Sequence, residues 1–176
     1  LHSNTTADNN TAVGYQAGYA NTTGYSNVAL GQGSLSANQT GVQNVAVGKD
    51  ALLNHTANNT TAVGRDSLKS NTTGVSNTAL GYRTLQANIT GGNNTAVGSN
   101  ALDLNTASNN TAVGADALGS NTGADNNSAI GAYTLLSNTT GSGNIAVGTS
   151  ALQNNTTGNS ATAVGYQALF TQTTGG

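Results

Sequence analysis

The chain has 176 residues, of which only 6% are charged, and its formal net charge is −2. Its four basic residues are too few to neutralise a run of phosphates, so the composition excludes nucleic acid as a partner. The absence of cysteine excludes a disulfide scaffold, and no apolar run reaches the roughly 18 residues that a membrane-spanning helix needs, so we expect no membrane insertion.

A short motif recurs along the chain: Ala, then Val, Leu or Ile, then Gly. It first occurs at residues 12–14 and last at residues 163–165, and successive motif glycines are 16 or 17 residues apart. These glycines are Gly14, Gly31, Gly48, Gly64, Gly81, Gly98, Gly114, Gly131, Gly148 and Gly165. A fixed period of this length is typical of a solenoid, in which each repeat packs mainly on its neighbours.

Each repeat begins with a predicted short strand, residues 11–14 in the first coil. Thr11 and Val13 share one face of this strand, and Ala12 and Gly14 share the other, because side chains alternate along a strand. A turn follows, then a second short strand around an Ala-Leu pair, and then a turn at an Asn-Thr-Gly segment.

The predicted fold class is therefore all-β: a parallel β-solenoid of about ten coils of 16–17 residues, roughly 48 Å long at about 4.8 Å per coil. We expect one repeat array over residues 1–176. Since neither end resembles the polar cap of a solenoid, we expect it to be a segment of a longer fibre.

Small residues occupy fixed positions because identical residues on successive coils stack about 4.8 Å apart, which leaves no room for bulky side chains. The predicted structural columns are Ala12, Ala29, Ala46, Ala62, Ala79 and Ala96, and Gly14, Gly31, Gly48, Gly64, Gly81 and Gly98. Two Asn columns are predicted to form amide ladders or to hold turn backbone. The first includes Asn10, Asn27 and Asn44, and the second includes Asn21, Asn38, Asn54 and Asn71.

The sequence offers little for catalysis. Asp50, Asp66 and Asp116 each follow a motif glycine by two residues and are predicted to be solvated turn residues, and His55 is predicted to lie exposed in a turn. No nucleophile elbow, phosphate loop or metal-ligand cluster occurs, so we expect no enzyme activity, no cofactor and no metal.

Each coil is thin and is expected to bury one Val and one Leu, which leaves little stability margin against the cost of ordering the chain. We therefore expect identical chains to associate along one face.

The repeat also resembles known families. The pattern Asn, then Thr, Val, Ser or Ile, then the motif is similar to the repeat of trimeric autotransporter adhesin heads, which are left-handed parallel β-rolls wound as homotrimers. The full unit, as in residues 94–106 and 162–175, resembles repeats of phage tail-fibre proteins. The resemblance implies a homotrimeric fibre shaft or adhesin head segment that spaces or displays a receptor-binding tip. It also implies a location outside the cell, on the cell surface or in a virion tail fibre, with a cell-surface glycan or receptor as a further partner.

Other interpretations stay open. Ranks of Thr beside the turns offer an alternative function, an ice-binding face; they include Thr22, Thr40, Thr56, Thr72, Thr90, Thr139 and Thr156. Sequons such as those at Asn4, Asn9, Asn21, Asn38, Asn58, Asn71, Asn93 and Asn138 signal glycosylation or simply follow from an Asn- and Thr-rich repeat. Six scattered tyrosines are surface residues or weak sugar contacts.

Overall fold

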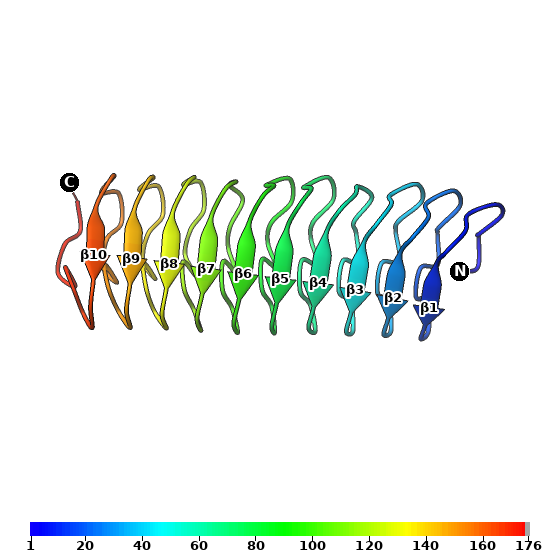
Figure 1. Ribbon diagram of the computed structural model, residues 1–176, viewed down its shortest axis with the longest axis horizontal. Coiled ribbons are helices and arrows are strands. Elements are labelled where there is room, and N and C mark those ends of the chain that lie inside the picture. Colours follow the sequence, from blue (N-terminus) through cyan, green and yellow to red (C-terminus); the bar gives the residue numbers. More distant parts are fainter. Residues whose placement is uncertain (175–176) are drawn as a thin grey trace.

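The computed structural model describes residues 1–174 as a straight rod of stacked coils, each contributing one short strand (Figure 1). The strands form a single ten-stranded parallel sheet in chain order, β1 to β10. They are β1 Thr11–Val13, β2 Val28–Leu30, β3 Val45–Val47, β4 Thr61–Val63, β5 Thr78–Leu80, β6 Thr95–Val97, β7 Thr111–Val113, β8 Ser128–Ile130, β9 Ile145–Val147 and β10 Thr162–Val164. The predicted parallel β-solenoid with a period near 17 residues is confirmed.

Equivalent residues of neighbouring coils pair with each other along the whole sheet. Ala12 pairs with Ala29, and Ala62 pairs with Ala79, which in turn pairs with Ala96. The register also holds between β3 and β4 and between β6 and β7, where the coil is one residue shorter. The shorter coils lose their residue in the turn before the next strand, so the columns stay aligned.

Side chains alternate between the two faces of each strand, and the alanine side chains face the interior of the rod. The strand alanines from Ala46 to Ala146 are fully buried, whereas Val13 and Val164 at the ends of the sheet are 63% and 71% exposed. The expectation that each coil buries the Val before the motif glycine is wrong. The interior between the two walls of the coil holds only an alanine from the sheet, so the larger aliphatic residue faces outward.

Opposite the sheet lies a second wall, made of the residues that follow the motif glycine by two to six positions; we call it the turn wall. Its Leu column, Leu35 to Leu152, is fully or almost fully buried and packs against the strand alanines. The prediction of a second strand here is wrong. Leu52 has φ of 51° and Leu68 has φ of 50°, in the left-handed region, which cannot continue an extended strand.

Coil-to-coil hydrogen bonds nevertheless continue along the turn wall. The amide of Leu35 donates to the carbonyl of Ala51 at 3.0 Å, and that of Leu68 donates to Thr84 at 2.9 Å. Left-handed backbone is costly for a residue with a side chain. Here it directs each Leu into the interior and keeps its amide paired, so burial and hydrogen bonding offset that cost.

The motif glycines are required by both backbone conformation and space. Gly98 has φ of 129°, and a Cβ atom placed on it would lie 2.6 Å from the carbonyl oxygen of Gly114 on the next coil. Gly14 is in the same position relative to Gly31, with 2.7 Å to its carbonyl carbon. Any side chain at these positions would force the two coils apart.

Gly98→Ala is therefore expected to lower the free energy of unfolding by more than about 2 kcal/mol, because the new Cβ meets backbone and the φ is unfavourable for alanine. Urea denaturation followed by circular dichroism measures the change. The control is Ser99→Ala at the neighbouring exposed residue, which we expect to stay within about 0.5 kcal/mol of the parent chain. Equal stability of the two variants would contradict the close approach of the coils.

Candidate functional site

The first Asn column bridges successive coils through the backbone. The amide N–H of Asn27 donates to Oδ1 of Asn10 at 2.9 Å, and that of Asn44 donates to Oδ1 of Asn27 at 2.9 Å. The side-chain Nδ2 of Asn27 donates to the carbonyl of Gly41 at 2.8 Å. These side chains are thus engaged in hydrogen bonds with the next coil.

The second Asn column combines a side-chain ladder with turn capping. Nδ2 of Asn38 donates to Oδ1 of Asn21 at 3.1 Å and also to the carbonyl of Gly41 in its own turn at 3.0 Å. The amide of Gly41 donates back to Oδ1 of Asn38 at 3.0 Å. Further along the rod, Nδ2 of Asn155 donates to Oδ1 of Asn138 at 3.0 Å. This column closes the turn between coils and repeats the same bonds along the rod.

In the third coil a histidine takes the place of this Asn. His55 is fully buried, and its Nδ1 lies 2.7 Å from Oδ1 of Asn71. Asn54, which the sequence placed in the column, is exposed. Both the exposed His55 and the ladder position of Asn54 are therefore wrong predictions. The third coil is one residue shorter than its neighbours. The column residue lies three positions after the Leu of the turn wall, so counting forward from Leu52 identifies His55, whereas counting back from the next strand identifies Asn54.

His55 is also a weak point of the ladder. Its Nε2 and the Nδ2 of Asn71 are buried with no hydrogen-bond partner in the described residues. Burial lowers the pKa of the His55 imidazole, while the hydrogen bonds to Asn71 and to the backbone of Ala57 act in the opposite direction. The neutral imidazole is therefore the form that fits the folded coil.

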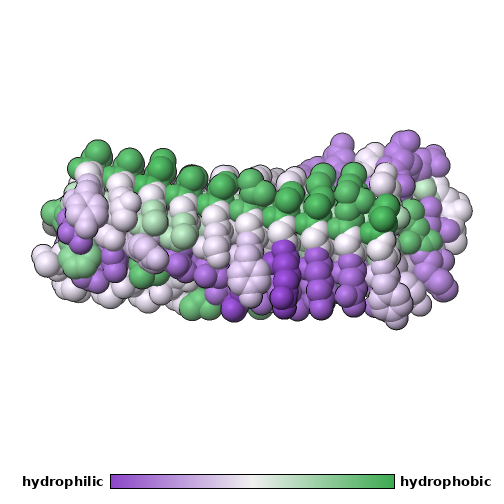
Figure 2. Space-filling model, turned by 90° about the horizontal axis from the view of Figure 1, so that it is seen from below, coloured by the Kyte–Doolittle hydropathy of each residue, from purple (hydrophilic) through white to green (hydrophobic). Residues whose placement is uncertain are grey.

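The outward-facing residues that precede the motif glycines form a continuous apolar row, visible in green along the length of the rod in Figure 2. We call this row the apolar stripe; it consists of Val13, Leu30, Val47, Val63, Leu80, Val97, Val113, Ile130, Val147 and Val164. All ten side chains are exposed or half-buried, and none of these positions carries a polar residue. Contiguous exposed apolar surfaces are typical of interaction sites.

Charged residues gather in the middle coils. Lys49 and Arg65 directly follow motif glycines, next to the apolar stripe, whereas Lys69 on the turn wall pairs with two carboxylates. Its Nζ donates to Oδ1 of Asp66 at 3.0 Å and to Oδ2 of Asp50 at 3.3 Å, and the hydrogen bond to Asp66 is the main cause that raises the pKa of Lys69. Asp66 is 7% exposed, so the prediction of a solvated turn residue is wrong at this position.

Within residues 1–174 no group of three His, Cys, Asp or Glu residues is placed to hold a metal ion. The same residues contain no helix long and apolar enough to cross a membrane.

The sequons divide into buried and exposed groups. Asn21, Asn38, Asn71 and Asn138 are at most 2% exposed, so their amide nitrogens are inaccessible in the folded coil, whereas Asn9, Asn58 and Asn93 are exposed.

The Thr ranks lie in turns and not on the sheet. The Oγ1 of Thr22 donates to the carbonyl of Gln39 at 3.0 Å, and that of Thr139 donates to Thr156 at 3.0 Å. Their hydroxyl hydrogens are used between coils.

No protein-family model matches this chain, and searches of curated proteins and of solved structures found no significant match.

We expect the rod to lose stability as the pH falls from 7 to 5. His55 has its ordinary pKa near 6.5 when unfolded and a lowered pKa when folded, so the unfolded chain binds more protons in this range. The thermal midpoint should fall with pH in the parent chain and fall less in His55→Asn, which restores the ladder residue. His2→Asn, at an exposed histidine, is the control. The same pH dependence in His55→Asn as in the parent chain would contradict the assignment.

Because the hydroxyls of Thr22, Thr72 and Thr139 donate to the next coil, we expect no thermal hysteresis from this chain. Ice-growth measurements at several protein concentrations test this directly. Concentration-dependent hysteresis that disappears in Thr72→Val, where Oγ1 donates to Ile89 at 3.2 Å, would contradict it and favour the ice-binding alternative.

Proposed function

We propose that this chain is a structural rod, a segment of a fibre shaft or adhesin head that spaces or displays a receptor-binding tip. In this proposal identical chains assemble through the apolar stripe as a homotrimer, outside the cell, on a cell surface or in a virion tail fibre. The rod carries no catalytic function.

The observation that carries the proposal is the apolar stripe. A partner must bury apolar side chains that recur once per coil along all ten strands. A second copy of this chain has the same spacing between its stripe residues. When two rods lie parallel, each stripe residue of one chain can therefore contact the equivalent residue of the other. Parallel chains around a rotation axis give each stripe the same environment, which is the closed symmetry that homo-oligomers favour.

The thin interior supports the same conclusion. Each coil buries small alanines on the sheet wall and a single Leu on the turn wall, while its second aliphatic residue stays outside. Burying that residue between chains adds hydrophobic stabilisation of about 25 cal/mol for each Å² removed from water. The number of chains, three, and the biological setting come from the resemblance to adhesin heads and tail fibres.

The test is a charge placed in the stripe. Ile130→Asp is expected to shift the assembly to monomers or to weaken it at least tenfold, because the carboxylate would be desolvated at the interface. Sedimentation equilibrium gives both the mass of the parent assembly and its dissociation.

Ile89→Asp is the matched control. Ile89 lies in a turn and is 50% exposed, against 45% for Ile130, so the two substitutions are alike except for their position. A folded parent chain that sediments as a monomer would refute the proposal, as would equal effects of the two substitutions.

A further inference from the structure

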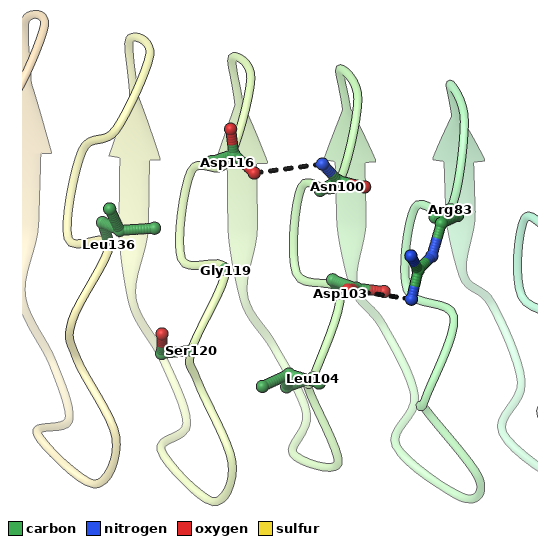
Figure 3. A pocket seen from close by; sticks show the side chains of 8 residues that line it. All are labelled: Arg83, Asn100, Asp103, Leu104, Asp116, Gly119, Ser120 and Leu136. Atoms are coloured by element: carbon green, nitrogen blue, oxygen red, sulfur yellow. Dashed lines mark hydrogen bonds and ion pairs between the residues drawn. The ribbon is translucent and has the colours of Figure 1, made fainter.

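One position on the turn wall lacks a side chain where the neighbouring coils have one. The fifth residue after the motif glycine is Asp103 in the sixth coil, Gly119 in the seventh and Leu136 in the eighth. The φ of Gly119 is not in the left-handed region, and a Cβ atom placed on it would lie 3.2 Å from Cδ1 of Leu136 and 3.3 Å from the carbonyl oxygen of Asp116, so a side chain here requires a shift of a few tenths of an ångström in these neighbours. The missing side chain leaves a hollow of about 240 Å³ on the surface of the rod (Figure 3).

The hollow is lined by polar groups from three coils. Oδ1 of Asp116 accepts a hydrogen bond from Nδ2 of Asn100 at 3.1 Å, and Oδ2 of Asp103 lies 3.7 Å from Nη2 of Arg83. Among residues 1–174 each carboxylate therefore has one oxygen in a polar contact, which leaves its other oxygen to accept from a ligand. The Asp103 side chain is only 19% exposed, and this burial raises the pKa of its carboxyl group.

The remaining lining combines a hydroxyl with apolar walls. Ser120 adds a group that both donates and accepts, and Leu104 and Leu136 lie on either side of it in Figure 3. Two carboxylates disfavour an anionic ligand, and the guanidinium of Arg83 disfavours a small metal cation. The lining instead suits an uncharged ligand with several hydroxyl groups and an apolar C–H face.

We infer that this hollow binds one ring of a saccharide, with the carboxylates of Asp103 and Asp116 accepting from its hydroxyls and Leu136 packing against its C–H face. Pockets for drug-sized ligands have about 300–1,000 Å³, so a hollow of about 240 Å³ fits a single sugar ring. The residues come from the turn wall, with the strands behind them in Figure 3, so the site stays open when the apolar stripe is covered. The inference does not depend on self-association.

The experiment uses saturation-transfer-difference NMR with the methyl glycosides of glucose, galactose, mannose and N-acetylglucosamine, each added to the intact chain. We expect saturation transfer to at least one glycoside, with a dissociation constant on the order of 1 mM for a ligand of this size. Amide shifts on titration should be confined to Gly119, Ser120 and the side chain of Asn100. Absence of transfer to all four glycosides would overturn the inference.

Gly119→Gln fills the hollow with a residue that the fifth and ninth coils carry at the same position, Gln86 and Gln153. It is expected to weaken binding at least about tenfold. The matched control is Ser36→Gln in the same column of the second coil, away from the hollow, which should bind as the parent chain does.

Asp116→Asn is a second variant, nearly identical in shape, that removes one carboxylate and is also expected to weaken binding. Circular dichroism establishes whether each variant is folded. If Gly119→Gln does not fold, glycoside binding by Asp116→Asn tests the inference. Undiminished binding by folded Gly119→Gln or by Asp116→Asn would overturn the inference, as would equal loss in Ser36→Gln.

Discussion

Backbone hydrogen bonding between successive coils is the constraint on which this structure depends. It sets the coils about 4.8 Å apart and places each residue over its equivalent on the next coil. At that distance Gly14 and Gly31 cannot carry a Cβ, and the space between the walls admits only an alanine facing a Leu. The Asn columns follow from the same spacing, because an amide side chain reaches the backbone of the next coil and no further.

This constraint separates the inside of the rod from its outside. Inside, the chain repeats the same few residues with little variation, since each must fit beside its own copies. Outside, the apolar stripe is kept in every coil although its side chains stay exposed or half-buried in the part of the chain that the structure describes. The outward-facing positions of the turn wall vary from coil to coil and carry the ion pairs of Lys69 and the hollow at Gly119. Assembly and ligand binding are thus proposed for different faces of the same rod.

The period alone was sufficient to predict the solenoid, its coil number and the stacking of equivalent residues. Alternation along the strand identifies two faces but does not show which one lies inside. Val13 is more apolar than Ala12, so composition favours burying Val13. Only the nearness of the turn wall, which the sequence does not show, keeps Val13 out of the interior. The left-handed backbone at Leu52 could not be predicted, since leucine rarely adopts it. The burial of His55 is not predicted because the one-residue deletion in the third coil can be assigned to either side of the position that belongs to the second Asn column. The hollow arises from a missing side chain in an irregular column and emerges only when residues of four coils are placed together.

An experimental density map of this rod, from crystals or electron cryomicroscopy, tests the central claim most directly. Our account predicts that the Cα atoms of Ala62, Ala79 and Ala96 lie in a straight line about 4.8 Å apart, with Leu80 pointing away from the interior. A map in which these alanines are out of line, or in which Leu80 fills the space between the walls, would contradict it.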